Sequence, residues 1–297
     1  MGTRQPLFTN DFKSIILAIF QINSKHLVHD MIEVFSKGGS GMLIDQHLHT
    51  NYSWDCRERL ENYLILTKND LVTTEHLDYY DFKVNGHYEP DYARYIAEID
   101  QLSKKYQRNV YRGIEVGYTP KDALRIREYL ADKSYDLILL AIHQDGEVNY
   151  MSRAARARNP LQILDEYLEL VSIALDDVDY AQVLAHIDFG MRMIDLPLQL
   201  LTIREHKIVE VMKKLVEKNM AFEVNTRSLY QYDNEKMYEI FLSIYKSLGG
   251  ELISLGSDTH STGMYMFEFD RAIRFLKKMG FHQVTQGINQ KLHLVDI

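Results

Sequence analysis

The chain has 297 residues, of which 46% are hydrophobic and 26% charged, the composition of an ordinary soluble globular protein with a substantial core. Its formal net charge of −8 argues against nucleic acid as the main partner, and the single cysteine, Cys56, excludes an internal disulfide framework and fits a reducing cytoplasm. No apolar run approaches the roughly 20 residues that a membrane-spanning helix needs.

The N-terminal residues differ from the rest of the chain. Apolar periodicity predicts two short helices, over residues 11–22 and 24–35, and the glycine-rich run 38–41 reads as a linker. We therefore expect an N-terminal helical extension over residues 1–41, followed by one larger domain over residues 42–297.

From residue 42 onward, short apolar or β-branched runs alternate with longer amphipathic segments. Leu161, Leu164 and Leu168 recur at three- and four-residue intervals, the helical period. The predicted strands are 42–49, 70–76, 110–118, 136–143, 182–188, 221–226 and 251–260. The predicted helices are 57–67, 90–106, 121–132, 161–175, 202–218, 235–248 and 268–279. Seven βα units imply parallel strands, which fit either an open doubly wound sheet or a closed barrel.

Most predicted strands end in a histidine or a carboxylate. The first ends in the run Asp45-Gln46-His47-Leu48-His49, whose alternate side chains share one face of a strand. Six of the 12 histidines fall at such ends: His47, His49, His76, His143, His186 and His260. Only a barrel brings the C-terminal ends of all its strands around one mouth. The sequence therefore favours a barrel with a polar cluster at its mouth.

Three carboxylates, Asp55, Glu115 and Asp258, complete this cluster. Imidazole and carboxylate groups suit Zn, Fe or Mn, and the number of groups suits two or three ions. Neighbouring cations generate hydroxide from bound water at neutral pH and neutralise the oxygens of a phosphoryl group. We therefore predict hydrolysis of a phosphoester, with hydrolysis of an amide as an alternative on the same chemistry.

A phosphate substrate also favours arginines that are not metal ligands, because the planar guanidinium matches phosphate oxygens. Arg192 follows the fifth predicted strand and Arg227 follows the sixth, and Arg158 lies in a basic loop. A solvated or salt-bridged arginine is the alternative for each.

Together, these motifs resemble the polymerase and histidinol phosphatase (PHP) superfamily, and most closely its histidinol-phosphate phosphatase branch. The resemblance runs from Met42 to near the C-terminus, and its motifs are the D-x-H-x-H run, Thr74-Glu75-His76, Gly113-Ile114-Glu115-Val116-Gly117, His143, His186 and Gly256-Ser257-Asp258-Thr259-His260. It implies a distorted TIM-like barrel of seven βα units and a trinuclear metal site. It also implies hydrolysis of L-histidinol phosphate to L-histidinol and phosphate, a step of histidine biosynthesis. For such a substrate, Asp145 and Glu147 in the loop after the fourth predicted strand are candidates to bind the ammonium group, and a solvated acidic loop is the alternative.

The resemblance further implies how the ligands are divided. The sets are His47, His49, Glu115 and Asp258 for one ion, Glu115, His143 and His186 for a second, and Asp55, His76 and His260 for a third. Asp55 stands where many superfamily members have histidine, so the third ion is expected to bind differently or more weakly. In the expected mechanism a metal-bridging hydroxide attacks phosphorus, and Asp188 or His260 protonates the leaving alkoxide.

Other functions remain open at this point. One is a phosphoesterase for another small phosphorylated metabolite; the others are a metal-dependent nuclease and a non-catalytic metal-binding protein. The acidic charge argues against the nuclease, and the complete ligand set argues against the non-catalytic protein. We expect a cytoplasmic enzyme with no nucleic acid or membrane partner, and the sequence gives no oligomeric state.

Overall fold

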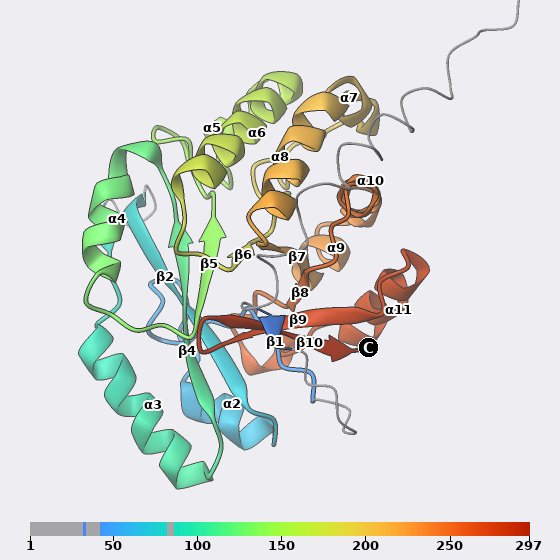
Figure 1. Ribbon diagram of the computed structural model, residues 1–297. Coiled ribbons are helices and arrows are strands. Elements are labelled where there is room, and N and C mark those ends of the chain that lie inside the picture. Colours follow the sequence, from blue (N-terminus) through green and yellow to red (C-terminus); the bar gives the residue numbers. More distant parts are fainter. Residues whose placement is uncertain (1–31, 34–41, 82–85) are drawn as a thin grey trace, which may run out of the picture.

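The computed structural model describes residues 32–33, 42–81 and 86–297, which form one curved sheet wrapped by helices (Figure 1). The strands are β1 (Ile32–Glu33), β2 (Leu71–Asp81), β3 (Gly86–Tyr88), β4 (Val110–Gly117), β5 (Leu137–Ala141), β6 (Val183–Leu184), β7 (Ala221–Asn225), β8 (Ile253–Gly256), β9 (Gln283–Ile288) and β10 (Lys291–Asp296). Their order in the sheet is β1-β10-β9-β8-β7-β6-β5-β4-β2-β3. The pairs from β2 through β4 to β9 are parallel, as the repeated βα units predict.

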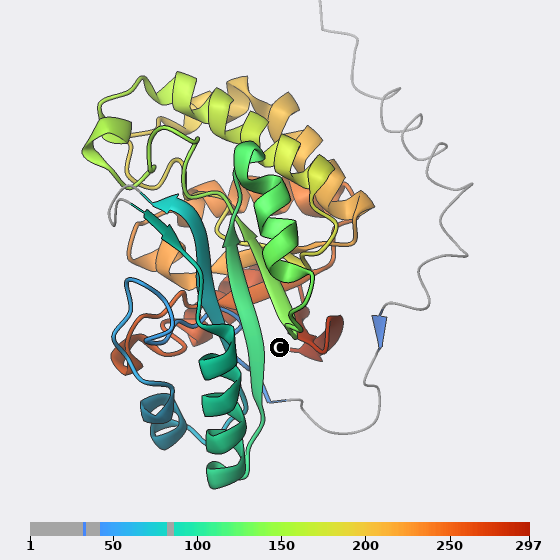
Figure 2. The same ribbon diagram turned by 90° about the vertical axis from the view of Figure 1, so that its left-hand side faces the viewer.

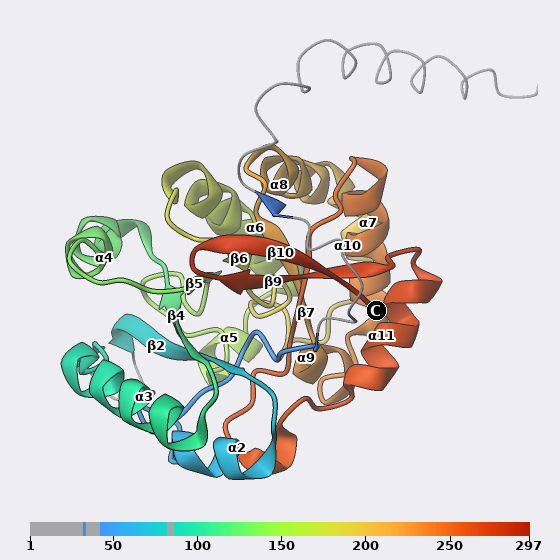
Figure 3. The same cartoon turned by 60° about the horizontal axis from the view of Figure 1, so that its bottom comes forward.

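The helices lie outside the strands. They are α2 (Leu60–Leu66), α3 (Tyr92–Tyr106), α4 (Ala123–Leu130), α5 (Arg153–Arg156), α6 (Pro160–Asp177), α7 (Leu198–Ile203), α8 (Glu205–Glu217), α9 (Thr226–Tyr230), α10 (Glu235–Ser247) and α11 (Phe269–Lys278). Figure 2 shows α3 and α4 on the outer side of β2, β4 and β5, and Figure 3 shows the helices as a ring around the strands. Among the described helices, none combines the length and the apolar character that crossing a bilayer requires.

The segment before α2 closes the sheet into a barrel. The Gln46 amide donates to the Leu255 carbonyl of β8 at 3.1 Å, and the Thr74 amide of β2 donates to the Leu48 carbonyl at 2.7 Å. The segment therefore lies between β8 and β2, which the sheet order alone leaves apart. This closure is what gathers the C-terminal strand ends around one mouth.

The same segment is not the regular strand predicted over residues 42–49. Only one isolated bridge, at Leu48, is strand-like. Side chains take the place of backbone partners, because the Leu48 amide donates to Thr74 Oγ1 at 3.0 Å and the His47 amide donates to Asp45 Oδ1 at 3.2 Å. The segment is extended, but its hydrogen bonds do not form a ladder.

Alternate residues of the strands build two separate cores. On β5, Leu137, Leu139 and Ala141 pack inside the barrel with Val72 and Val183, in a small apolar cluster. The intervening residues Ile138 and Leu140 belong to the larger cluster between the barrel and the helices. A strand that is buried on both faces reads as a continuous apolar run, which explains the pattern of residues 137–142.

The β9–β10 hairpin lies across the bottom of the barrel, opposite the mouth (Figure 3). The Gly287 amide donates to Gln46 Oε1 at 2.7 Å, and a Cβ at this glycine would lie 2.4 Å from the Leu137 side chain. The sequence analysis did not predict this hairpin. Its signal is the two-residue turn Asn289-Gln290, where both residues adopt positive φ (52° and 61°), between runs of β-prone residues.

The predicted N-terminal extension mostly lies outside the described residues. This holds for the helix at 11–22 and the linker at 38–41. The second predicted helix, 24–35, is wrong at its end, because Ile32 and Glu33 form the short strand β1 parallel to β10. An edge strand offers unpaired backbone groups to any neighbouring extended segment, which accounts for the pairing. The domain boundary at residue 41 stays a prediction.

Candidate metal centre

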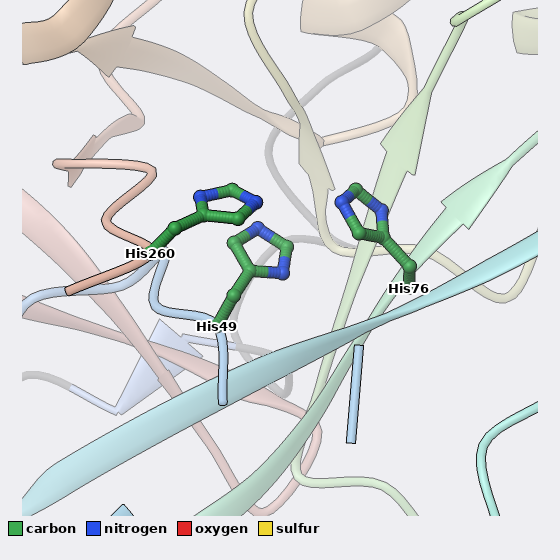
Figure 4. A group of neighbouring side chains, drawn as sticks. All are labelled: His49, His76 and His260. Carbon is green, nitrogen blue, oxygen red and sulfur yellow. The ribbon is translucent and has the colours of Figure 1, made fainter. Parts of the chain in front are cut away.

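The structure brings all nine predicted ligands together at the mouth of the barrel. They come from the closing segment, from β2 and β4, and from the loops after β5, β6 and β8. Among the described residues, four groups have ligand atoms close enough to hold a cation: His49, His76 and His260; His47, Glu115 and His186; His47, His49 and Asp258; and His76, Asp78 and His143. Figure 4 shows the rings of the first group pointing toward one another.

Glu115 on β4 lies at the centre of the cluster. Its Oε1 is 2.6 Å from His186 Nε2 and 3.0 Å from His143 Nε2. Its Oε2 is 3.0 Å from His76 Nδ1 and 3.3 Å from His47 Nε2. Each oxygen therefore faces a different set of imidazoles, and the carboxylate offers one donor atom to each set.

Two further contacts extend the cluster toward the loops. His47 Nε2 and His49 Nε2 face each other at 3.1 Å, an arrangement in which at most one nitrogen can donate and which a shared cation would stabilise. Asp55, from the loop before α2, lies 3.5 Å from His76 Nε2 and 3.2 Å from His260 Nε2. The third predicted ligand set is therefore close in space.

Outer carboxylates fix the orientation of two of these histidines. Glu223 on β7 lies 2.7 Å from His47 Nδ1, and Asp78 on β2 lies 2.9 Å from His143 Nδ1. An acceptor at Nδ1 keeps the hydrogen there, so that the Nε2 lone pair faces the cluster. Neither carboxylate was predicted from the sequence to have a role at the site. For Asp78 the signal was its place two residues after His76 on one strand.

A hydroxyl relay orients His49 in the same way. Ser53 Oγ donates to Glu75 Oε2 at 2.6 Å, so its lone pair accepts from His49 Nδ1 at 3.1 Å. Glu75 is fully buried, and it also accepts from the Thr50 hydroxyl at 2.6 Å. Burial raises the pKa of Glu75 despite these donors. Glu75 therefore supports the centre from outside.

Asp45, which was expected to share a face with His47 and His49, lies outside the four ligand groups. It accepts from the Ser257 amide at 2.9 Å and from the Met266 amide at 3.1 Å. Burial raises its pKa to about 6. Asp45 thus attaches the closing segment to the loop after β8, because the irregular backbone does not keep strand alternation.

The electrostatics of the cluster fit cations. Burial opposes protonation of His76, but the negative charges of Glu115 and Asp55 outweigh it and raise the pKa of His76 to about 9. Burial together with the positive charge of His260 lowers the pKa of His49 well below its usual value. Glu115 Oε2 and His76 Nδ1 are buried without a well-aligned hydrogen bond. Buried imidazoles and carboxylates in this arrangement suit Zn²⁺, Fe or Mn.

Two of the three predicted phosphate-binding arginines line the pocket above this cluster, together with Trp54, Phe189 and Tyr232. Arg192 Nη1 is 3.8 Å from Asp258 Oδ2, and Arg227 Nη1 is 3.8 Å from Asp258 Oδ1. The two guanidinium groups therefore flank one carboxylate at the edge of the cluster.

The third arginine, Arg158, is not among the residues that line the pocket. Its Nη1 is 2.6 Å from Asp145 Oδ2, and its other nitrogen pairs with Glu166 of α6. Asp145 and Glu147, the candidates to bind an ammonium group, do not line the pocket either. Asp145 instead pairs with Arg158 and accepts from two amides of its own loop. The roles predicted for these three residues stay predictions.

The two predicted proton donors differ in position. His260 lines the pocket, and its Nδ1 is 3.1 Å from the Asp258 carbonyl oxygen. Asp188 does not line the pocket; it is fully buried and accepts from four side chains, one of which is Arg192. Through these contacts Asp188 holds its neighbours in place and does not face the substrate pocket.

Asn225 both hydrogen-bonds within the mouth and caps the next helix. Its Oδ1 accepts from the Ser228 amide at 3.0 Å and caps α9. Its Nδ2 donates to Glu223 Oε2 at 3.2 Å, and the same oxygen accepts from the His186 amide at 2.6 Å. Asn225 therefore links the support of the metal cluster to the helix beside the arginines.

Comparisons with known proteins agree with this geometry. No family model matches the chain. The histidinol-phosphatase of Lactococcus lactis subsp. lactis (strain IL1403) is 22% identical over 263 residues, which are 84% of this chain and 96% of that protein. The probable histidinol-phosphatase of Thermotoga maritima is 24% identical over 246 residues, which are 82% of this chain and 95% of that protein.

One solved structure is similar over most of its length. It is the Lactococcus lactis histidinol phosphate phosphatase complexed with Zn, L-histidinol and phosphate, with a TM-score of 0.75 at 21% identity, over 84% of this chain and 98% of that chain. This match confirms the predicted fold, a distorted TIM-like barrel. Together with the sequence relatives, it confirms the resemblance of this chain to the histidinol-phosphatase branch that the motifs predicted.

Proposed function

We propose that this chain is a metal-dependent phosphomonoesterase that hydrolyses L-histidinol phosphate to L-histidinol and phosphate. The observation that carries the proposal is a cluster of six imidazoles, five of them buried, and their carboxylates, centred on Glu115, with two arginines at its edge. The identity of the substrate rests on the relatives, which are named histidinol-phosphatases.

Two or three metal ions would occupy the cluster. Their proposed ligands are the nine residues His47, His49, Asp55, His76, Glu115, His143, His186, Asp258 and His260. Zn is supported by the similar solved structure, and Fe and Mn suit the same donors. When bound, the ions supply an activated water and neutralise the charge of the phosphoryl oxygens.

The protein itself binds and orients the substrate. Arg192 and Arg227 are proposed to bind the phosphate oxygens, since both reach the pocket beside Asp258. The apolar side chains of Phe189 and Met151 line the same pocket and would limit the access of water to the leaving group.

Of the two predicted proton donors, only His260 lines the pocket, so we retain it as the donor to the leaving alkoxide. Because Nδ1 faces the Asp258 carbonyl oxygen, both proposed roles of His260 use Nε2, so His260 serves as a ligand or as the proton donor at any one time and not as both. A small phosphorylated metabolite as the substrate, no nucleic acid or membrane partner, and a cytoplasmic location complete the proposal.

The test is phosphate release from a panel of phosphorylated metabolites by metal-replete protein, with metal content measured on the same sample. We expect L-histidinol phosphate to have the highest kcat/KM of the panel. His143→Ala should lose bound metal and activity together, whereas His206→Ala, an exposed position on α8, should change neither. Faster turnover of another phosphomonoester would contradict the substrate. A His143→Ala protein as active as the parent would contradict the metal-dependent reaction.

A further inference from the structure

Arg192 is held in a closed ring of hydrogen bonds on the side away from the metal cluster. Its Nε donates to Asp188 Oδ2 at 3.2 Å, and its Nη2 donates to Ser228 Oγ. Ser228 Oγ in turn donates to Asp188 Oδ1 at 2.8 Å. The hydroxyl therefore accepts from the guanidinium and donates to the carboxylate, which completes the ring. All three residues are buried.

Asp188 is itself fixed by two donors from the segment that follows α9. Asn234 Nδ2 donates to Asp188 Oδ2 at 2.9 Å, and the Tyr238 hydroxyl on α10 donates to Asp188 Oδ1 at 3.0 Å. Both Asp188 and Tyr238 are fully buried, and neither lines the pocket. Their hydrogen bonds therefore serve Arg192 and not the substrate.

This arrangement leaves one edge of the Arg192 guanidinium for a ligand. The guanidinium has five N–H groups, and the ring of hydrogen bonds uses two of them, the one on Nε and one on Nη2. Nη1 lies on the side of the metal cluster, 3.8 Å from Asp258 Oδ2, which is too long for a hydrogen bond. The aromatic rings of Phe189 and Tyr232 lie 5.0 Å and 4.9 Å from the guanidinium carbon and restrict its movement further.

We propose that Asp188, Ser228, Asn234 and Tyr238 are positioning residues that preorganise Arg192 to bind a phosphoryl oxygen through Nη1. An arginine that is already fixed loses little side-chain entropy when it binds an anion. The α9–α10 segment thereby becomes part of the phosphate subsite without contacting the phosphate. The inference rests on the proposed function only in that the ligand of the pocket carries a phosphoryl group.

The test compares two tyrosines of α10. Tyr238→Phe removes the hydroxyl that fixes Asp188, whereas Tyr245→Phe removes an equally buried hydroxyl that donates to the Leu252 carbonyl, away from the pocket. The readout is the binding of inorganic phosphate to metal-loaded protein, measured by calorimetry, together with the thermal midpoint and metal content. We expect Tyr238→Phe to weaken phosphate binding about threefold to tenfold, and Tyr245→Phe to leave it within about twofold of the parent.

A double-mutant cycle distinguishes positioning from a merely structural role. If Tyr238 acts through Arg192, then adding Tyr238→Phe to Arg192→Met should not weaken phosphate binding further. The inference would be overturned if Tyr238→Phe weakened phosphate binding equally in the parent protein and in Arg192→Met. Unchanged phosphate binding in the single Tyr238→Phe variant would also overturn it. Phosphate binding does not require turnover. A parent protein that binds phosphate but does not hydrolyse L-histidinol phosphate would therefore contradict the proposed function and not this inference.

Discussion

The two sides of the pocket are built differently. On the metal side, buried imidazoles stand at or just after the strand ends and converge on Glu115, and carboxylates hold their outer nitrogens. On the arginine side, Arg192 and Arg227 come from loops and from α9, and only Arg192 is fully enclosed; the Arg227 side chain is 29% exposed.

The difference shows that one pocket can combine a rigidly held group of metal-binding side chains with arginines whose positions can vary. The metal side is fixed by the barrel itself, so its geometry changes only if the strands move. The arginine side depends on a chain of side-chain hydrogen bonds through α9 and α10, so it can vary without any change in the barrel. We therefore expect substitutions on the metal side to remove activity, and substitutions on the arginine side to change mainly the binding of phosphate.

The largest effect is expected at Glu115. In Glu115→Gln the carboxylate loses its charge, and one of the two oxygens that face the buried histidines becomes a donor nitrogen. We expect metal content to fall and kcat/KM for L-histidinol phosphate to decrease by more than about 1000-fold. Metal analysis and phosphate release on the same sample measure both, and Glu128→Gln on the exposed face of α4 is the control. Retention of full activity would show that the metal side does not carry the chemistry.

A smaller loss is expected one step further out, at Glu223. Glu223→Gln keeps the shape of the side chain but places an amide nitrogen among the donors from His47, His186 and Asn225. We expect metal affinity to fall about 10- to 100-fold, as is typical for outer carboxylates of metal-bound histidines. Competition with a chelator of known affinity measures the change. Unchanged affinity would mean that His47 is oriented by other groups.

The metal-free protein should lose stability as the pH rises. Burial lowers the pKa values of His76 and His143, but neighbouring carboxylates outweigh it, and His76 reaches about 9. The folded state holds these protons more tightly than the unfolded state. The two histidines therefore contribute their full stabilisation of the folded state below about pH 6.5, and this stabilisation is lost as the pH rises toward 9. We expect the thermal midpoint to fall by about 5 °C over this interval. A metal-loaded sample should not show this fall. A metal-free protein whose thermal midpoint does not change between pH 6.5 and 9 would contradict the raised pKa values of His76 and His143.

The smallest effect is expected at Arg158, and comparison with Arg227 tests which of the predicted arginines bind phosphate. Arg227→Met should weaken phosphate binding about tenfold, because the loss of one charged contact has roughly that cost. Arg158→Met should leave phosphate binding within about twofold, because Arg158 pairs with Asp145 and Glu166 outside the pocket lining. Equal losses in the two variants would return Arg158 to the phosphate subsite.

Much of the fold was predictable because its pattern is local. The apolar runs and helical periods located β4, β5, β7, α3, α6 and α10 within a few residues. The segment at 42–49 could not be described in advance, because side chains of Asp45 and Thr74 replace its ladder partners. The predicted strand 182–188 shrinks to the two residues of β6, since His186 has a positive φ of 20° that no sequence pattern reports.

The site likewise has features that the sequence could predict and features that it could not. The convergence of the nine predicted ligands could be expected because a barrel places the ends of all its strands together, whatever the details of the loops. Arg192 could be named, but its partners could not, because Ser228 and Tyr238 lie on separate helices far along the chain. The position of Arg158 could not be predicted from the sequence, because a basic loop has the same composition whether it faces the pocket or pairs with a neighbouring helix.

The most direct measurement is a metal titration of chelated protein, with bound metal and the release of phosphate from L-histidinol phosphate followed on the same sample. We predict no turnover in the metal-free protein and a rate that rises with each ion bound until two or three are present. Turnover by the metal-free protein, or a fully loaded protein that is inert toward this substrate, would contradict the central claim.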